Sequence, residues 1–136
     1  MITVSSVINQ PLFADHGEHP RNNGPLREFT GHARITGPCG DTMEFWVFVQ
    51  GGRVEQASFT TDGCRHSLAC GSMTTCLAKG KTLDEALKLG RRDILGALED
   101  LPEEGEICAL LSSVTLHASL RDSVGRSHEL YAGEQQ

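Results

Sequence analysis

The region from Met43 to Thr61 constrains the fold more than any other part of the sequence. Apolar side chains recur at every second position from Met43 to Val49, Gly51 and Gly52 follow, and a second strand-like run covers 54–61. Adjacent glycines accept the positive φ angles of a tight turn, so the two runs predict an antiparallel hairpin. A further strand is predicted at 33–36. One face of this sheet is apolar and must be covered by other elements.

Helices that follow the sheet are predicted to provide this cover. Residues 65–79 are followed by Gly80, a common helix stop, and Thr82 with Glu85 forms a capping box that opens the next helix. A third helix is predicted over 92–98 and a fourth from Glu106 to about Ser123. The fourth carries apolar residues three and four positions apart, which are Ile107, Leu110, Leu111, Val114 and Ala118. Strands first and helices afterwards indicate an α+β fold, a three-stranded antiparallel sheet covered by C-terminal helices.

The rest of the chain predicts a single domain over residues 1–136, with an ordered core at about 11–123. Pro11 is typical of a helix start and predicts a short N-terminal helix. Residues 17–31 are rich in turn formers and predict a surface loop. The residues from Gly125 onward are polar, and we expect them to be loosely held.

Charge and composition exclude several classes of function. The chain has 12 basic and 18 acidic residues and a net charge of −6, which has the wrong sign for binding nucleic acid. No apolar run approaches the roughly 20 residues of a membrane span. Five cysteines are an odd number, so we expect free thiols in the reducing cytoplasm rather than a disulfide framework. A domain of 136 residues needs no metal for stability, and any metal is expected to be functional.

Three cysteines and one aspartate are the candidate metal ligands. Cys39 and Asp41 are separated by Gly40, so their side chains can point to the same side of the chain. A small buried cysteine and a turn-forming aspartate would explain this motif equally well. Cys64 is expected at a helix start, where the helix dipole favours a reactive thiolate over a merely packed thiol. Cys108 is also expected near a helix start, although a core position remains the alternative.

The other cysteines and the histidines are weaker candidates. Cys70 and Cys76 follow Cys64 at intervals of six, which on a helix point about 120° apart and rise roughly 9 Å per step. One ion cannot collect all three thiols. His66 is the histidine beside a candidate ligand, so it is a possible additional ligand. A thiol protease is not supported, because neighbouring side chains on a helix diverge and no third group orients His66.

Five motifs in the chain resemble the IscU/NifU N-terminal family of iron-sulfur cluster scaffolds, in order and at matching spacing. They cover about residues 11–123. The motifs are Asp15-His16 with His19–Gly24, Gly37–Asp41, Thr61–Cys64, Gly80–Leu87 and Cys108–Leu111.

The resemblance implies a SufE/NifU-like fold of the IscU type, with the candidate ligands at one exposed end. It implies that Cys39, Cys64 and Cys108 accept sulfur from a cysteine desulfurase. With Asp41, they would hold a transient [2Fe-2S] or [4Fe-4S] cluster and pass it to acceptor proteins. The chain is then a scaffold and not an enzyme. The one oxygen ligand, Asp41, is the expected release handle, because it binds iron less firmly than a fourth thiolate would.

The chain departs from the family pattern at two places. Ile107 occupies the position before the last cysteine, where many members have a histidine. Residues 101–105 read Leu-Pro-Glu-Glu-Gly where members served by a dedicated Hsp70-type chaperone have Leu-Pro-Pro-Val-Lys. Acidic residues replace the apolar and basic part of that motif, which argues against delivery through this chaperone.

Two other functions remain open at this point. The first is a zinc-dependent persulfide carrier that uses the same four residues. Members of that branch have a longer segment between the second and third cysteines, and this chain has no such insertion. Zinc can also occupy these thiolates when no cluster is bound. The second is an interaction module with inert cysteines.

Overall fold

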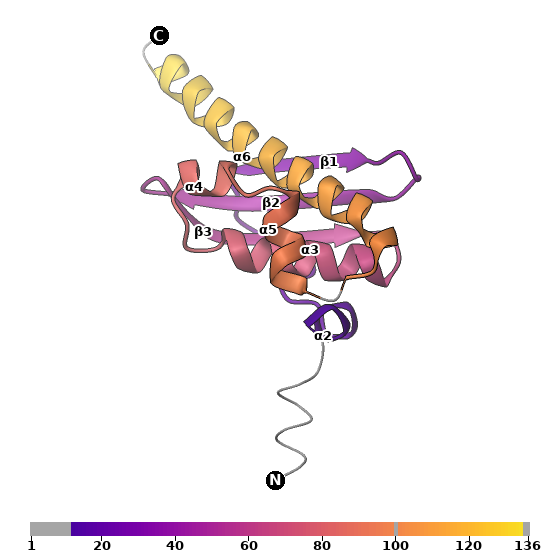
Figure 1. Cartoon of the computed structure of the whole chain (residues 1–136). Helices are drawn as coiled ribbons and strands as arrows, with labels where there is room; N and C mark the ends of the chain where they lie inside the picture. Colours follow the sequence, from indigo (N-terminus) through magenta and orange to yellow (C-terminus); the bar gives the residue numbers. More distant parts are fainter. Residues whose placement is uncertain (1–11, 100, 135–136) are drawn as a thin grey trace.

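The computed structural model describes residues 12–99 and 101–134 and has the predicted α+β architecture (Figure 1). Its elements are α2 (Leu12–Glu18), β1 (Gly31–Thr36), β2 (Thr42–Gln50), β3 (Arg53–Thr61), α3 (Arg65–Ala78), α4 (Leu83–Leu87), α5 (Arg91–Leu98), a 3-10 turn (Glu103–Gly105) and α6 (Glu106–Glu134). The predicted helix start at Pro11 lies outside the described residues. No helix in the described part of the chain is long and apolar enough to cross a membrane.

The three strands form one antiparallel sheet in the order β1-β2-β3, which confirms the predicted hairpin. Gly51 and Gly52 have φ angles of 60° and 75°, the left-handed values that the tight turn between β2 and β3 requires. Phe45 pairs with Ala33 on one side and with Phe59 on the other. This register places Ala33, Phe45 and Phe59 on one face of the sheet, and Trp46 lies on the opposite face with its partners His32 and Ser58.

Helices α3 and α6 cover the face that carries Phe45, and α5 packs against these two helices (Figure 1). Met43, Phe45 and Val47 of β2 are completely buried beneath them. Helix α3 packs so closely on β3 that a side chain at Gly71 would collide with the ring of Phe59. The capping box is present as predicted, with Thr82 and Glu85 each accepting from the other's backbone N–H at the start of α4.

The buried face of α6 agrees with the predicted pattern at Leu111 but not at Ile107, Leu110 and Val114, which are about 40% exposed. Leu116, Leu120 and a set of small polar residues are buried in their place. The buried hydroxyl residues on α6 are Ser112, Ser113, Thr115, Ser119 and Ser123. The physical reason is the short distance between α6 and β1: a Cβ at Gly31 would collide with the Ser119 carbonyl oxygen. Large apolar side chains do not fit into this contact.

Helix α6 also continues further than predicted, to Glu134 instead of about Ser123. The sequence between these positions contains no proline, and its two glycines, Gly125 and Gly133, each cost a helix only about 1 kcal/mol. In Figure 1 the end of α6 extends past the sheet.

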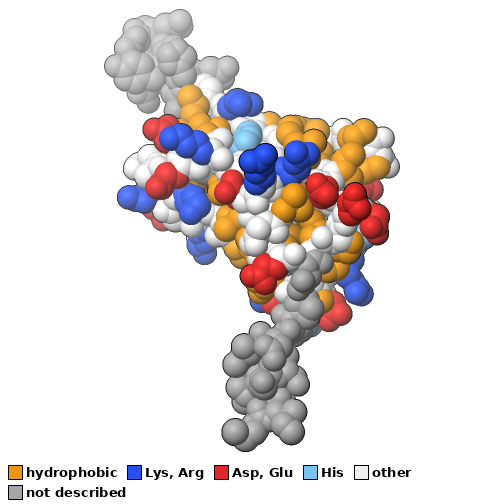
Figure 2. Space-filling view, viewed as in Figure 1, with side chains coloured by type: hydrophobic (Ala, Val, Ile, Leu, Met, Phe, Trp, Pro, Cys, Tyr) orange, Lys and Arg blue, Asp and Glu red, His pale blue; other side chains and the backbone are white. Residues whose placement is uncertain are grey.

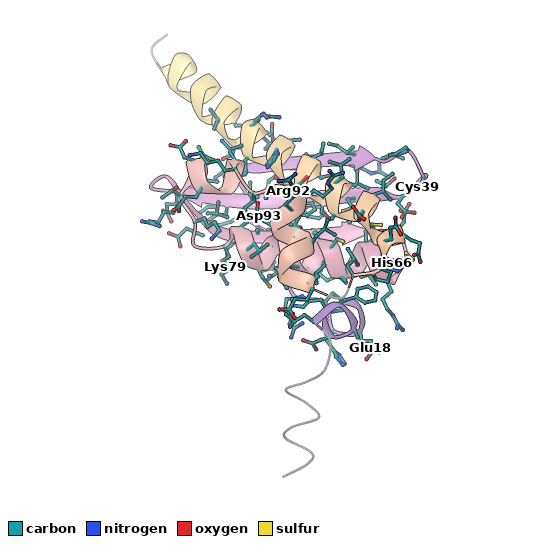
Figure 3. All side chains as sticks on the ribbon, in the orientation of Figure 1. Glu18, Cys39, His66, Lys79, Arg92 and Asp93 are labelled. Carbon is teal, nitrogen blue, oxygen red and sulfur yellow. The ribbon has the colours of Figure 1, made fainter. Side chains whose placement is uncertain are left out.

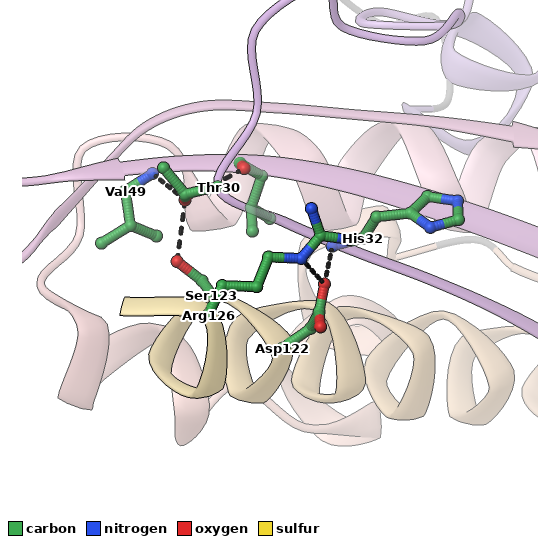
Figure 4. Close-up of polar contacts among 7 residues, drawn as sticks. Thr30, His32, Val49, Asp122, Ser123 and Arg126 are labelled. Carbon is green, nitrogen blue, oxygen red and sulfur yellow. Dashed lines mark hydrogen bonds and ion pairs between the residues drawn. The ribbon is translucent and has the colours of Figure 1, made fainter. Parts of the chain in front are cut away.

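Polar contacts fasten α6 to the start of β1 (Figure 4). Asp122 accepts hydrogen bonds from the His32 backbone N–H (2.9 Å) and from Arg126 Nε (2.8 Å). Ser123 donates to the Thr30 hydroxyl at 2.7 Å. Because β1 is an edge strand, the bond from His32 also satisfies a donor that has no strand partner. Together with the packing of α6 on β2, α3 and α5, this contact holds the helix that carries Cys108.

Helix α2 is held against α3 by buried polar contacts. His16 Nδ1 lies 2.6 Å from the Ser72 hydroxyl, which also accepts the backbone N–H of Arg21 at 2.8 Å. Arg21 returns to α2 through an ion pair with Asp15 at 2.7 Å. Burial lowers the pKa of His16, and the nearby Arg21 adds to this effect. His16 is therefore a satisfied structural residue.

Candidate metal centre

Cys39 lies in the short loop between β1 and β2, and its thiol is exposed. The loop is closed by two backbone hydrogen bonds, from Gly37 to Asp41 and from Gly40 to Gly37. Gly40 has a φ of 90°, which favours glycine. Asp41 directly precedes β2, so the strand fixes the position of its backbone. In Figure 3, Cys39 lies at the same end of the molecule as His66 on α3.

Cys64 occupies the N-cap of α3 and is exposed. Its sulfur lies 3.4 Å from His66 Nδ1, and the His66 ring stacks on Phe13 of α2 with 5.3 Å between ring centroids. The predicted divergence of Cys64 and His66 is therefore wrong. Cys64 has extended rather than helical backbone angles, so its side chain can turn towards the first turn of the helix.

Cys108 is the third residue of α6 and, unlike the other two cysteines, is buried, with 5% of its surface exposed. Burial raises the pKa of the Cys108 thiol, and a hydrogen bond from Ser67 partly opposes this. Negative charge on Cys64, Asp41 and Cys39 raises this pKa further, so all three lie near enough to act on Cys108. Cys108 is therefore both a candidate ligand and a residue of the hydrophobic core.

Ser67 connects two of the candidate ligands and was not found from the sequence. Its hydroxyl lies 3.1 Å from Asp41 Oδ2 and 3.4 Å from Cys108 Sγ, and the residue is completely buried. Gly63 lies against the same group, because a Cβ there would be 2.7 Å from Asp41 Oδ2 and closer still to the Ser67 hydroxyl. No sequence motif marks a helical serine that contacts two candidate ligands. The one available signal is its position three residues after Cys64, which places it in the first turn of the same helix.

The structure thus brings Asp41 and Cys108 together through Ser67 and sets Cys64 beside His66. Within residues 12–99 and 101–134, no three His, Cys, Asp or Glu side chains already stand in a metal-binding arrangement. The donor set itself fits an iron-sulfur cluster or zinc, since it offers thiols with one carboxylate at an accessible end of the fold.

The remaining cysteines make no contact with the candidate ligands among the hydrogen bonds of the described residues. Cys70 is completely buried in the core, where burial strongly raises its thiol pKa, and Cys108 and Cys64 lie near enough to add to this effect. Cys76 is exposed, two turns further along α3 than Cys70. Cys70, Cys76 and Cys64 do not gather at one point, in agreement with the helical geometry.

An apolar groove of about 180 Å³ adjoins the site between the end of β1 and the first turns of α6. It is lined by Ile35, Pro38, Leu111 and the exposed Ile107, Leu110 and Val114, with Thr36 and Gly37. Glu103, Glu104 and Glu106 are exposed at the adjacent start of α6. Figure 2 shows hydrophobic side chains on this part of the surface, with acidic side chains beside them.

Comparisons with known proteins find relatives over most of the chain. The model of the NifU-like N-terminal domain matches residues 9–129. The iron-sulfur cluster assembly scaffold protein IscU 1 of Archaeoglobus fulgidus is 38% identical over 109 residues, covering 79% of this chain and 71% of that protein. IscU of Escherichia coli K12 is 37% identical over 113 residues, covering 79% of this chain and 88% of that protein.

Solved structures agree on the fold. The N-terminal part of a NifU-like protein from Brucella abortus has a TM-score of 0.70 at 16% identity and covers 90% of this chain and 97% of that one. A SUF-system scaffold protein from Fervidobacterium islandicum has a TM-score of 0.66 at 19% identity and covers 85% of this chain and 98% of that one. The chain belongs to the NifU-like N-terminal domain family, as its motifs predicted.

Proposed function

We propose that this protein is a scaffold on which iron-sulfur clusters are assembled and from which they are transferred to acceptor proteins. Cys39, Cys64 and Cys108 accept sulfur and, with Asp41, bind iron. The observation that carries this proposal is the direct link of Asp41 to Cys108 through Ser67, beside the helix start that holds Cys64. Relatives at 37–38% identity are named for the same role.

Sulfur enters most directly at the exposed thiols. The Cys64 thiolate attacks the outer sulfur of a persulfide on a cysteine desulfurase, the S–S bond of that persulfide breaks, and the desulfurase cysteine leaves as a thiolate. His66, 3.4 Å from the Cys64 sulfur, orients this thiol. Each transferred sulfur needs two electrons to become sulfide. An external donor such as a ferredoxin-type protein, or dithiothreitol in vitro, supplies them.

Asp41 makes the site temporary. Iron-sulfur clusters favour thiolate ligands, so one carboxylate oxygen binds a cluster less firmly than a fourth sulfur would. We expect Asp41→Ala to retain a reconstituted cluster longer than the unaltered protein in the presence of an apo acceptor. The decay of the visible absorption and the appearance of acceptor cluster measure this. Unchanged rates of decay and transfer would remove this role from Asp41.

The partners follow from this function. A cysteine desulfurase supplies sulfur, and apo iron-sulfur proteins or carriers receive the cluster. The exposed apolar groove and the three adjacent glutamates suit a desulfurase surface with apolar side chains among basic ones. Glu103 and Glu104 replace part of the motif that members served by the dedicated Hsp70-type chaperone carry, which argues against this chaperone as a partner. We assign the chain to a single domain and to the cytoplasm. We expect no nucleic-acid or membrane partner, and we expect the protein not to turn over a small substrate.

Anaerobic reconstitution with iron, cysteine, dithiothreitol and a desulfurase tests the proposal. We expect visible thiolate-to-iron absorption with matching iron and sulfide content, as a [2Fe-2S] or a [4Fe-4S] cluster. Single changes of Cys39, Cys64 or Cys108 to serine should abolish it. The matched control is Cys76→Ser, an exposed cysteine on the same helix as Cys64, which should retain it.

A zinc-dependent persulfide carrier is the second candidate, because the same three thiols and carboxylate suit tetrahedral zinc. A colourless protein that binds one zinc tightly and passes persulfide without assembling a cluster would support it. Cluster assembly that survives in all three serine variants would contradict the ligand assignment that both functions share.

A further inference from the structure

Ser67 is the buried hydroxyl residue on α3 and α6 that contacts two proposed ligands. Ser72, Ser112 and Ser123 also contact groups outside their own helix, but none of these groups is a proposed ligand. Five others donate to a backbone carbonyl three or four positions earlier in their own helix, which is the usual arrangement. They are Thr74, Thr75, Ser113, Thr115 and Ser119. The Ser67 hydroxyl instead makes side-chain contacts with Asp41 and Cys108, 26 and 41 positions away in the sequence.

These two contacts join three separate elements of the fold. Asp41 belongs to the loop before β2, Ser67 to the first turn of α3 and Cys108 to the first turns of α6. The group is closely packed, since even a methyl group at Gly63 would meet both Asp41 and Ser67. A completely buried hydroxyl without a hydrogen-bond partner lowers the stability of the folded protein. The fold is therefore most stable when the Asp41 carboxylate and the Cys108 sulfur stay in contact with Ser67.

We propose that Ser67 is a positioning residue that sets the Asp41 carboxylate beside the Cys108 sulfur before a metal arrives. This inference rests on the ligand set of the proposed function. The hydroxyl carries one proton, so it donates to the carboxylate or to the sulfur, and its oxygen can accept from a Cys108 S–H. It can therefore keep contact with one ligand while the other turns to the metal. Groups that hold metal ligands from behind commonly change metal affinity about 10- to 100-fold when removed.

Anaerobic titration of the cluster-free protein with Co²⁺ tests this, because thiolate-to-cobalt absorption reports binding directly. We expect Ser67→Ala to weaken Co²⁺ binding about 10-fold, at the lower end of the effects of such supporting groups. Ser112→Ala is the matched control. It also removes a buried hydroxyl, but one that contacts Met43 Sδ and no proposed ligand, and it should change affinity less than about twofold.

A double-mutant cycle separates positioning from a general loss of structure. In the Asp41→Ala background, where the carboxylate is already absent, Ser67→Ala should weaken Co²⁺ binding only about twofold or less. An equal loss in both backgrounds would mean that Ser67 only supports the fold, and this would overturn the inference. Unchanged affinity of Ser67→Ala in the unaltered background would overturn it as well.

The pair Ser67→Thr and Ser67→Val keeps the inference testable even where Ser67→Ala fails to fold. Threonine and valine have nearly the same shape, but only threonine has the hydroxyl. We expect the threonine variant to bind Co²⁺ about 10-fold more tightly than the valine variant. Equal affinities would contradict the role of the hydroxyl.

Cluster reconstitution on the same proteins distinguishes the two proposals. An unaltered protein that shows the Co²⁺ coupling but assembles no cluster would contradict the proposed function and leave the role of Ser67 intact. Normal cluster assembly with no effect of Ser67→Ala on Co²⁺ binding would contradict the role of Ser67 and leave the proposed function intact.

Discussion

Helices α3 and α6 each carry a candidate ligand at their start, but the two cysteines have opposite environments. Cys64 caps α3, is exposed and has His66 as its neighbour. Cys108 is inside the first turns of α6, is buried and contacts Ser67. Burial raises the pKa of the Cys108 thiol, so the proton stays on this sulfur to higher pH than on an ordinary thiol.

Similar positions on two helices therefore do not make two thiols equivalent. The Cys64 sulfur is exposed, so it can meet a sulfur donor from outside. The Cys108 sulfur is buried, so it is suited to bind what has already arrived.

The largest difference is expected in chemical reactivity. At pH 7 iodoacetamide should modify Cys108 at least about 10-fold more slowly than Cys64, since Cys108 is buried while Cys64 is exposed, and the raised pKa of Cys108 acts in the same direction. The rate at Cys108 should rise as the pH passes the ordinary thiol value of 9.0. Peptide mapping by mass spectrometry measures both rates, and the denatured protein is the control. Equal rates in the folded protein would break the comparison.

A change at Gly63 should affect the Cys108 side through Asp41 and Ser67. Gly63→Ala introduces a methyl group into their contact, and overpacking of this kind costs about 1–3 kcal/mol of unfolding free energy. Co²⁺ affinity should fall about 10-fold as the ligands are displaced. Chemical denaturation and metal titration measure these effects. Gly96→Ala on α5, where a Cβ meets no atom within 4 Å, is the control.

Loss of His66 should affect only the Cys64 side. His66→Ala removes the contact with the Cys64 sulfur, and one hydrogen bond is worth about 1 kcal/mol, or roughly fivefold in rate. Persulfide transfer to Cys64 should slow by this factor, while iodoacetamide labelling of Cys39 stays the same. His19→Ala, an exposed histidine after α2, is the control. An equal slowing at Cys39 would argue for a wider disturbance of the loop.

Acid should have the smallest effect, again on the side of α3. Burial lowers the pKa of His16 in the folded state, so protonation is unfavourable there. The stability present above the unfolded value of 6.5 should therefore decline as the pH falls through the lower folded value. Denaturation at pH 7.5 and 5.5 measures the difference, and His16→Gln should reduce it. A pH dependence that persists in His16→Gln would assign it to another group.

Local patterns predicted most of the fold. The hairpin followed from Gly51 and Gly52, and the capping box from Thr82 and Glu85, because backbone angles and helix ends depend on neighbouring residues. The buried face of α6 could not be predicted in the same way. It depends on how closely the helix approaches Gly31, a contact between segments about 90 residues apart. This close approach puts Ser119 against the sheet and leaves Ile107 and Leu110 on the outer side of the helix.

The candidate site was predicted residue by residue but not as an arrangement. Cys39, Asp41, Cys64 and Cys108 could be named from their motifs, and they remain the proposed ligands. Ser67 could not, because a hydroxyl on a helix usually bonds to its own backbone. The contact between Cys64 and His66 was missed because the helix begins one residue after the cysteine, and one residue decides whether the two side chains diverge.

The attachment of α6 to β1 through Asp122 has a mechanical consequence for the site. Cys108 lies fourteen residues before Asp122 along one continuous helix, a distance of about 21 Å at 1.5 Å per residue. A tilt of about 5° around Asp122 would shift the sulfur by nearly 2 Å, comparable to a metal–ligand bond. The hydrogen bonds at Asp122, together with the packing of α6 on the sheet and on α3, therefore limit how far the Cys108 sulfur can move.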